Sequence, residues 1–418
     1  MEARQPGHPV LDFGDDFDFT DPRLLARGLP IREFAEVRRT APIWWNQQDP
    51  ENGGGFHDGG FWVISKHAHI RQISRDPQTW SSYDKGCIMR YDNNISQEEI
   101  EAGKVMMHNS DPPVHTRLRK LISRGFTPRS VQRLEEGLAE AASQIVSAAA
   151  KKGSGDFVED VAHRLPLKAI ADLMGIPETD HERVFRWSNA MMNAEDPDNL
   201  DDPKLAMVEL IGYACELAAH RKQSPADDII TRLVTADEDG DQLTEIEFGY
   251  FILLLAVAGN ETTRNATSLG MKALLQNPDQ WELFKKNRPA TTVDEVVRWA
   301  SPVNAFQRTA HCDTELDGIQ IKQGERVGLF YGSANYDEDV FDDPFTFNIL
   351  RDPNPHLGFG GTGAHFCIGA SLARMELNIM FNAIADQMPN LRMAGPVRRM
   401  RSGWINGIVE MPVDFGTR

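Results

Sequence analysis

The sequence predicts a mainly α fold, in which one helix-rich domain carries small peripheral β-sheets and a long central helix. Amphipathic helical periodicity fills most of residues 129–300. No repeat, low-complexity block or linker divides the chain, so we expect a single domain over 1–418, with 1–20 as a flexible acidic arm. Short strand signals lie at 61–65, 319–321, 326–331 and 403–414, the last around a predicted Asn406-Gly407 hairpin turn.

The composition indicates a folded protein with an acidic surface. The chain has 418 residues, of which 41% are apolar, and its 62 acidic and 44 basic side chains give a net charge of −18. This apolar share is enough for a sizeable core. The negative balance, without any long block of Lys and Arg, argues against nucleic acid as the main partner.

The cysteines and the apolar stretches bear on where the protein works. Cys87, Cys215, Cys312 and Cys367 are far apart and show neither zinc-ligand spacing nor a disulfide framework, which favours a reducing, cytoplasmic location. The N-terminus lacks the basic start and apolar run of a signal peptide. The longest apolar stretch, at 248–259, has twelve residues, whereas a bilayer-spanning helix needs ~20, so we expect no membrane anchor.

Helix start and stop signals outline a short helix and, later, a very long one. The short helix is predicted to open at Asp111, with two prolines in its first turn, and to end at Gly125. Thr244 and Glu247 form the capping-box pattern of a helix start, and the helical pattern then continues to Pro278. About thirty residues at 1.5 Å each would span ~48 Å, enough to cross a whole domain.

The strongest chemical signal is the glycine-dense segment 357–370, which delivers Cys367 to a helical pattern at 371–387. Glycines permit positive φ angles and let a flat ligand lie against the backbone. A helix N-terminus lowers a thiol pKa from its ordinary ~8.5 and favours the thiolate that binds metals. A small buried cysteine is the alternative. A phosphate-binding loop is excluded because the order of strand, glycines, Lys and Ser or Thr is missing.

Four elements occur in the order typical of the cytochrome P450 haem-thiolate monooxygenases, and the chain resembles that family over nearly its whole length. Gly363, His365 and Gly369 keep the family's offsets from Cys367, whereas Phe359 lies eight residues before it rather than the usual seven. The four elements are Ala258-Gly259-Asn260-Glu261-Thr262-Thr263 in the long helix, Glu295-Val296-Val297-Arg298 in the next, Arg351 and the cysteine loop.

The resemblance implies haem b as cofactor, with the Cys367 thiolate as its axial ligand. Haem carries two propionates, which need cations or hydrogen-bond donors in a mostly apolar pocket. His115 and Arg119 are four apart and share a helical face, and the resemblance adds Arg308 and His365. A surface cation or a core histidine is the alternative for each of them alone. The implied haem contacts are His115, Arg119, Ala258, Gly259, Arg308, Phe359, Gly363, His365 and Gly369.

Glu261 and Thr262 match the family's acid–alcohol pair. The resemblance implies that Thr262 holds a hydrogen bond beside the iron and that Glu261 relays from solvent the two protons that O₂ activation takes up. The small residues just before them would let O₂ and substrate lie against the helix. The alternatives are that Thr262 bonds back to the Ala258 carbonyl and that Glu261 pairs with Arg264 or Asn265.

The helix after the long one is predicted to open with a capping box at Thr292 and Glu295 and to end before Pro302. Glu295 and Arg298 lie three apart on one face, among apolar neighbours that argue against a solvated pair. By the resemblance, these two residues and Arg351 form a buried ion triad with a structural role. Loss of one partner would then strand a buried charge at a cost of ~3–5 kcal/mol.

The electrons for a monooxygenase must come from other proteins. The sequence contains no flavin or nicotinamide fingerprint and no iron–sulfur cysteine set, and the resemblance implies a ferredoxin and a ferredoxin reductase as donors. Four basic residues near the cysteine side would give an acidic carrier a local dock, or are simply solvated charges. They are Arg117, Lys120, Arg124 and Arg374.

The implied substrate is apolar, because the pocket residues offer no charge to anchor an acid. By family position the lining residues are Ile88, Val257, Ala258, Val303, Phe306, Trp404 and Ile405. Segments 111–119 and 401–404, with the eight-residue spacing, are similar to actinobacterial P450s that oxidise the terminal methyl of a cholesterol-type side chain. This implies hydroxylation of cholesterol or cholest-4-en-3-one in steroid catabolism. The alternative is terminal hydroxylation of methyl-branched fatty acids or isoprenoids.

Two other classes of function compete with a monooxygenase. A peroxygenase would use hydrogen peroxide without redox partners, but such relatives usually lose the acid–alcohol pair that Glu261 and Thr262 retain. A haem-thiolate sensor would commonly bring an output domain, for which 418 residues of one fold leave no room.

Overall fold

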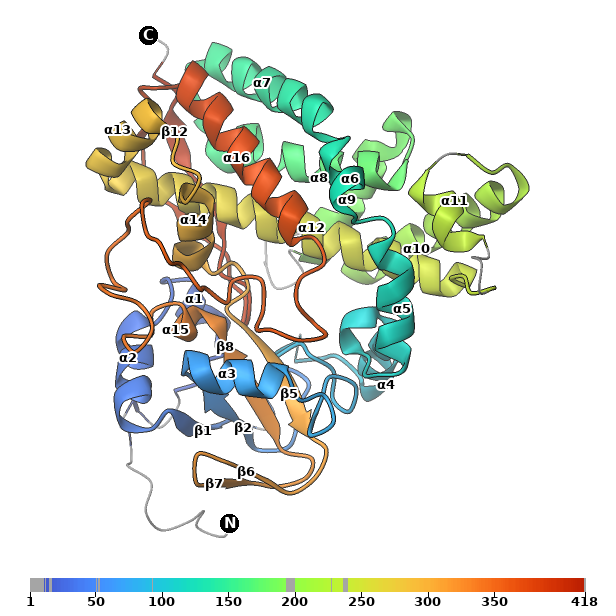
Figure 1. Cartoon of the computed structure of the whole chain (residues 1–418), viewed down its shortest axis with the longest axis vertical. Coiled ribbons are helices and arrows are strands. Elements are labelled where there is room, and N and C mark those ends of the chain that lie inside the picture. The colour runs from blue at the N-terminus through green and yellow to red at the C-terminus, as the bar shows by residue number, and fades with distance from the viewer. Residues whose placement is uncertain are drawn as a thin grey trace.

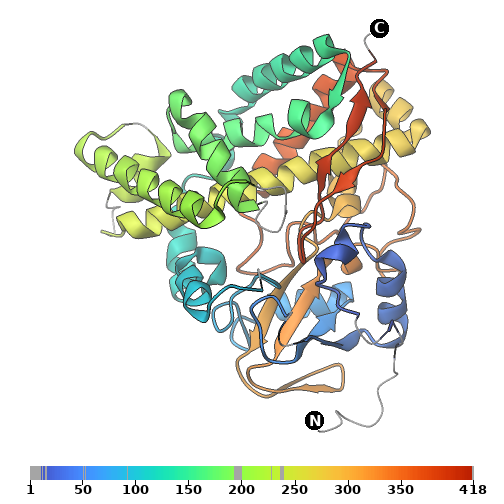
Figure 2. The ribbon, with the colours of Figure 1, turned by 180° about the vertical axis from the view of Figure 1, so that it is seen from behind.

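The computed structural model describes residues 11–416 except 12, 15, 16, 50, 52, 92, 193–199, 227 and 236–239. Most helices gather in one half of the molecule and the largest sheet lies in the other half (Figures 1 and 2). The helices are α1 Pro22–Leu25, α2 Ile31–Thr40, α3 His67–Ser74, α4 Gln97–Ala102, α5 Val114–Ser123, α6 Pro128–Gln132, α7 Glu135–Lys152, α8 Arg164–Met174, α9 His181–Met192, α10 Pro203–Gln223, α11 Ile229–Val234, α12 Glu245–Gln276, α13 Pro278–Asn287, α14 Thr292–Ala300, α15 Tyr331–Ala334 and α16 Ala370–Gln387, with the short turns η1 Gly103–Val105, η2 Met107–Asn109, η3 Val158–Ala162 and η4 Glu178–Asp180.

The sheets are small, as the sequence predicts. The largest has the strand order β1-β2-β8-β5-β3, with β2 and β8 parallel and the other neighbours antiparallel. The predicted hairpin at Asn406-Gly407 is wrong, because β11 pairs with β10 while β12 pairs with β4 and β9. The strands are β1 Ile43–Gln47, β2 Gly60–Ile64, β3 Trp80–Ser81, β4 Ser154–Asp156, β5 Ala305–Ala310, β6 Thr314–Leu316, β7 Ile319–Ile321, β8 Arg326–Phe330, β9 Arg392–Met393, β10 Arg398–Arg399, β11 Ile408–Glu410 and β12 Pro412–Asp414.

The long helix α12 crosses the middle of the molecule (Figure 1). It begins with the predicted capping box, in which the Thr244 hydroxyl accepts the Glu247 N–H and the Glu247 carboxylate accepts the Thr244 N–H. Helices α8, α9, α10, α14 and α16 pack around it. Gly270 allows α14 to come close, because a Cβ there would lie 2.5 Å from Val296 Cγ1. The prediction of a central, buried helix is confirmed.

Two predicted helix caps are wrong. Helix α5 begins at Val114 rather than Asp111, because the Asp111 carboxylate accepts hydrogen bonds from Ser81 Oγ and the Ser82 N–H instead of capping the helix. Helix α14 has no capping box, since Thr291 is its N-cap and makes no side-chain cap bond. The Glu295 carboxylate that would complete that box is held by two arginines instead.

The predicted flexible arm is partly folded. Residues 1–10, 12, 15 and 16 of this arm lie outside the described residues. Phe19, in contrast, is fully buried and stacks on Phe34 with ring centroids 4.9 Å apart, while its edge meets Trp44. The end of the arm therefore belongs to the core, which corrects the prediction of flexibility for 17–20.

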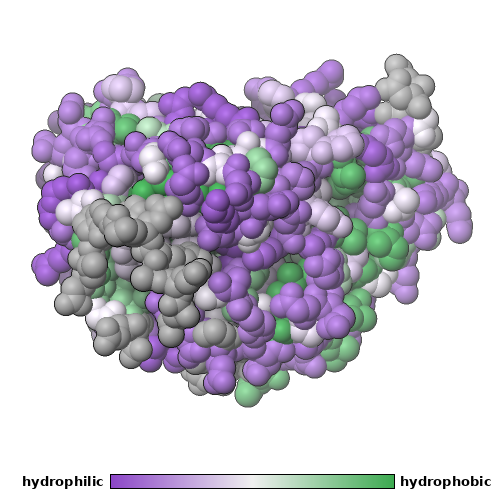
Figure 3. All heavy atoms as spheres, turned by 90° about the horizontal axis from the view of Figure 1, so that it is seen from below, coloured by the Kyte–Doolittle hydropathy of each residue, from purple (hydrophilic) through white to green (hydrophobic). Residues whose placement is uncertain are grey.

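The surface is mainly hydrophilic in the view from below, with hydrophobic residues in small groups (Figure 3). Exposed apolar side chains include Leu205 and Val208 on α10. Within the described part of the chain, no helix combines the length and the apolar character that crossing a bilayer requires.

A buried carboxylate ties α14 to the segment that leads into the cysteine loop. Glu295 accepts hydrogen bonds from Arg298 Nε at 2.7 Å and Nη2 at 2.8 Å, and from Arg351 Nε at 3.1 Å. All three side chains are buried, and the Asn348 N–H also donates to the carboxylate at 2.9 Å. Arg298 further donates to the Asn335 carbonyl at 2.8 Å. The structure thus brings the three residues of the expected triad into one network.

The substitution Glu295→Gln is expected to lower the free energy of unfolding by about 3–5 kcal/mol, because two buried guanidinium groups lose their anion. Urea denaturation of both proteins measures this change. Glu282→Gln is the matched control, since it removes the anion of an exposed i,i+3 pair with Lys285 and should change stability by at most ~1 kcal/mol. Equal effects of the two substitutions would contradict a structural role for Glu295.

Candidate functional site

The loop before α16 is folded so that Cys367 comes next to the helix start. The Cys367 N–H donates to the Phe359 carbonyl at 3.0 Å, which closes the loop across its one extra residue. Gly363 has φ +107°, and a Cβ there would overlap the Ser74 carbonyl oxygen, so only glycine fits. Helix α16 follows with Gly369 as its N-cap, close to the start predicted from the sequence.

Phe359, whose position the extra residue shifts, stays near the cysteine. Besides the backbone bond to Cys367, its ring lies under the Arg374 guanidinium at 4.4 Å and 5.7 Å from the His356 ring centroid. Arg374 itself pairs with Asp294 on α14 at 2.8 Å. The longer loop therefore still delivers an aromatic ring to this end of α16.

The electrostatics at Cys367 differ from the sequence prediction. Burial raises the pKa of the Cys367 thiol above its ordinary value and outweighs the backbone N–H groups of Gly369 and Ala370 and the charges of Arg119 and Arg374, which favour the thiolate. The side chain nevertheless keeps accessible surface. The predicted net fall in pKa from the helix N-terminus is thus wrong for the protein groups alone. A metal ion bound to sulfur takes the place of the proton.

Cationic and imidazole groups gather beside this loop. The rings of His115 on α5 and His365 lie 4.2 Å apart, and His365 Nε2 is 3.1 Å from Ser82 Oγ. Burial, followed by the charges of Arg308 and His115, holds the pKa of His365 far below its ordinary value. Burial, followed by Arg119, lowers the pKa of His115 to about 4. The structure thus places the four residues of the expected propionate set within electrostatic reach of one another.

His108 on η2 belongs to the same cluster, and sequence reasoning missed it. Its pKa is lowered to about 4 by burial and then by the charge of Arg308, and its buried Nδ1 has no hydrogen-bond partner. It lies on the short turn η2, before α5 begins at Val114, so no helical periodicity relates it to His115. No signal in the sequence could have joined it to the set.

This donor set fits haem b. One thiol at the start of α16 can ligate iron, and the neighbouring cluster of two guanidinium groups and three imidazoles suits the two propionates. Asp111 is the one carboxylate that acts on the pKa of His115, so the cluster has an excess of positive charge. His108 Nδ1 is buried without a hydrogen-bond partner, so it offers the haem one more polar contact.

The central turns of α12 show the alternative contacts considered for the acid–alcohol pair. The Thr262 hydroxyl donates to the Ala258 carbonyl at 2.6 Å. Glu261 is fully buried, and its Oε1 accepts hydrogen bonds from Arg264 and from Asn265 Nδ2, the latter at 2.7 Å. Glu261 Oε2 has no partner. Figure 1 shows this middle part of α12 beside the start of α16, with which it packs.

Gly259 is small for a different reason from the one expected. A Cβ at this position would overlap Ile170 Cδ1, so its size is set by the packing of α12 against α8. Ala258, by contrast, is exposed and Val257 is half-buried, so these two residues present surface on the other side of the helix. The expected space for O₂ and substrate thus depends on Ala258.

Four of the expected lining residues lie together between β5 and the C-terminal segment. Val303 and Ile405 form an antiparallel bridge, and the ring of Phe306 lies 5.7 Å from that of Trp404. The Trp404 carbonyl accepts the Asn304 N–H at 2.8 Å. Of the other expected lining residues, Ile88 and Val257 are half-buried and Ala258 is exposed.

The expected basic dock is weaker than the sequence suggests. Arg117 donates to Asp241 at 3.0 Å and to Glu247 at 2.7 Å, and the Glu247 hydrogen bond raises its pKa. Arg374 is paired with Asp294. Lys120 and Arg124, at the end of α5, are the other two members of the predicted dock.

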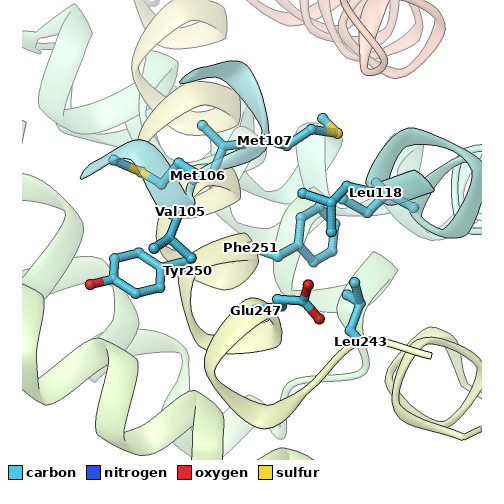
Figure 4. Close-up of a pocket in the computed structure, with 10 residues that line it drawn as sticks. Val105, Met106, Met107, Leu118, Leu243, Glu247, Tyr250 and Phe251 are labelled. Atoms are coloured by element: carbon cyan, nitrogen blue, oxygen red, sulfur yellow. The ribbon is translucent and has the colours of Figure 1, made fainter. Parts of the chain in front are cut away.

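A separate hollow lies at the beginning of α12 (Figure 4). It is formed mainly by apolar side chains such as Met106, Leu118, Tyr250 and Phe251. None of the residues predicted to bind haem or substrate lines it.

Comparison with known proteins agrees with this site. A cytochrome P450 family model matches residues 290–385. A steroid C26-monooxygenase of Mycobacterium tuberculosis is 58% identical over 100% of this chain and 97% of its own. A methyl-branched lipid omega-hydroxylase of the same species is 41% identical, over 91% of this chain and 90% of its own. The solved structure of a Mycobacterium marinum cytochrome P450 in complex with pseudoionone has a TM-score of 0.86 and 37% identity, covering 98% of this chain and all of that one.

The two histidines with low pKa values make the stability depend on pH. Between about pH 6.5 and pH 4 the unfolded chain takes up a proton at His108 and at His115, whereas the folded protein does not. The free energy of unfolding should therefore fall as the pH drops through this range. Urea denaturation at several pH values checks it. In His108→Gln, unfolding should take up about one proton fewer than in the wild-type protein; an unchanged slope in His108→Gln would contradict the assignment.

Proposed function

The chain belongs to the cytochrome P450 family, and we propose that it hydroxylates the terminal methyl of a steroid side chain, such as that of cholesterol or cholest-4-en-3-one. In this reaction the substrate C–H, O₂, two electrons and two protons give an alcohol and water. The observation that carries the steroid assignment is the similarity over the full chain to a steroid C26-monooxygenase. Terminal hydroxylation of a methyl-branched lipid is the second candidate, supported by a more distant relative.

Cys367 and the cationic cluster would hold the cofactor. Bound haem supplies the iron at which O₂ is activated, with electron density donated by the thiolate. The N–H groups of Gly369 and Ala370 favour negative charge on the Cys367 sulfur. Arg119 and Arg308, assisted by the neighbouring histidines, would pair with the propionates.

Thr262 and Glu261 would deliver the two protons that the reaction consumes. In the structure the Thr262 hydroxyl donates to a backbone carbonyl, which leaves its oxygen lone pairs free to accept a hydrogen bond. Glu261 has one carboxylate oxygen held by donors and one without a partner, so only Oε2 is free to carry a proton. We assign proton relay to Glu261 and the final hydrogen bond to Thr262.

The proposed substrate surface is apolar and aromatic. Phe306 and Trp404 offer adjoining ring faces, and Tyr331 meets the edge of Phe306 at 6.3 Å. Val303 and Ile405 extend this surface, and none of these side chains is charged. Such a surface suits a sterol skeleton or a branched alkyl chain and does not favour a carboxylate.

The electron donors are proposed to be a ferredoxin and its reductase, since the chain carries no flavin, nicotinamide or iron–sulfur fingerprint of its own. Lys120 and Arg124 at the end of α5 are the proposed contacts for an acidic carrier. Four free cysteines support a reducing, cytoplasmic compartment.

The first test is spectroscopic. Reduced protein treated with CO should show the long-wavelength band of a thiolate-ligated haem, and Cys367→His should lack it. Ferric protein titrated with cholest-4-en-3-one should change from low to high spin as the substrate displaces water from the iron. A change only with a branched fatty acid would favour the second candidate, and folded, haem-loaded protein without the CO band would overturn the assignment of Cys367.

Thr262→Ala should bind the steroid with an unchanged spin-state titration but form hydroxylated product about 10²-fold more slowly, with more hydrogen peroxide per electron pair. Product and peroxide are measured with a ferredoxin, its reductase and NAD(P)H. Thr267→Ala is the matched control, because Thr267 makes the same kind of back-bond, to the Thr263 carbonyl at 2.8 Å, on the same helix. Equal losses in both variants would assign only a structural role to Thr262.

A further inference from the structure

We propose that Asn265 and Arg264 are positioning residues for Glu261 and that β11 fixes Asn265 in turn. We call Arg264 and Asn265 the Glu261 clamp. The proposal rests on the proposed function, because it concerns the carboxylate that relays protons there. The role of the Glu261 clamp is to occupy one carboxylate oxygen of Glu261 and to leave the other oxygen free for the proton.

The clamp consists of residues on the next turn of α12. Arg264 and Asn265 stand three and four residues after Glu261, so both reach its carboxylate along one side of the helix. Arg264 Nη2 and Asn265 Nδ2 both donate to Oε1, the second at 2.7 Å. All three side chains are buried. Oε1 is thereby saturated with donors, while Oε2 is buried without any partner.

Asn265 is itself fixed from the opposite side. Its Oδ1 accepts the N–H of Ile408, the first residue of β11, at 3.2 Å. An added Cβ at Gly407 would lie 2.6 Å from Asn265 Oδ1 and Nδ2, so the backbone of Gly407 lies directly against the amide group. With Oδ1 committed to β11 and Nδ2 committed to Glu261, a flip of the amide would place like groups together at both ends.

This arrangement has a cost that a purely structural contact would avoid. A carboxylate oxygen and Arg264 Nε remain buried without partners, and each unpartnered buried polar atom is unfavourable. A side chain poised to accept and release a proton at Oε2 needs that oxygen free of donors. The proton arrives at Oε2, leaves toward Thr262 and returns Glu261 to its starting state, so that two such transfers supply the two protons of the hydroxylation.

The structure offers two substitutions that disturb the clamp without touching Glu261. Asn265→Asp keeps the shape of the side chain and its acceptor for Ile408, but removes the donor to Glu261 and places a second carboxylate against it. Gly407→Ala removes no polar group and instead pushes on the Asn265 amide through one methyl group. Each should slow product formation about tenfold, since a misplacement of ~1 Å can cost up to 10²-fold.

The readouts separate positioning from general damage. With cholest-4-en-3-one, a ferredoxin, its reductase and NAD(P)H, both variants should show the wild-type spin-state titration, slower product formation and a larger solvent isotope effect in D₂O. Gly137→Ala, whose added methyl meets nothing within 4 Å, and Asn382→Asp on the exposed side of α16 are the controls and should match wild type. A wild-type rate and isotope effect in both clamp variants would overturn the proposal.

A double variant tests the direct link between Gly407 and Asn265. In an Asn265→Ala background the space taken by the amide is vacated, so adding Gly407→Ala should cause no further loss. An additive loss would show that Gly407 acts by another route and would overturn the assigned link. If the wild-type protein lacked the thiolate CO band or steroid turnover, the proposed function would fail, whereas normal wild-type turnover with unaffected clamp variants would reject only the clamp.

Discussion

The passage of α12 through the interior is the constraint on which the rest of the structure depends. A helix surrounded by α8, α9, α10, α14 and α16 cannot leave polar side chains to water, so each must find a partner inside. Thr262, Thr267 and Ser268 return their hydroxyls to the carbonyl four residues earlier. Glu261 instead uses the following turn, and Asn265 extends that contact to β11. Most hydrogen bonds of these polar side chains therefore follow from the spacing of four residues along α12.

The clusters around Glu295 and beside Cys367 handle charge in two different ways. Around Glu295 one carboxylate is enclosed by two arginines, the Asn348 N–H and the Asn354 amide, and backbone carbonyls accept the remaining arginine hydrogen bonds. Beside Cys367 the arginines and histidines outnumber nearby carboxylates, which suits an anionic cofactor edge. The first arrangement holds the loop segment after α14 in place, and the second belongs to the site that this loop forms.

The sequence was most informative where local rules act alone. The capping box at Thr244, the long helix and the cysteine loop follow from residue spacing, and the structure contains all three. The same rule failed at Thr292, because the charge of two arginines competes for the Glu295 carboxylate across the fold. The thiol pKa of Cys367 was misjudged since burial, a property of the whole fold, outweighs the helix terminus. His108 was missed because it reaches its cluster from an irregular turn.

The parallel pairing of β2 with β8 has a consequence for how the chain folds. Trp62 stands opposite Val327, so 265 residues (327 − 62) separate two partners in one sheet. During synthesis at ~5–20 residues per second, β2 must wait on the order of tens of seconds for its neighbour to leave the ribosome. Throughout that time the apolar strand Gly60–Ile64, buried along its whole length in the finished sheet, has only β1 beside it. This half of the molecule therefore assembles late. A chaperone that covers exposed apolar strands would act mainly on the N-terminal quarter of the nascent chain.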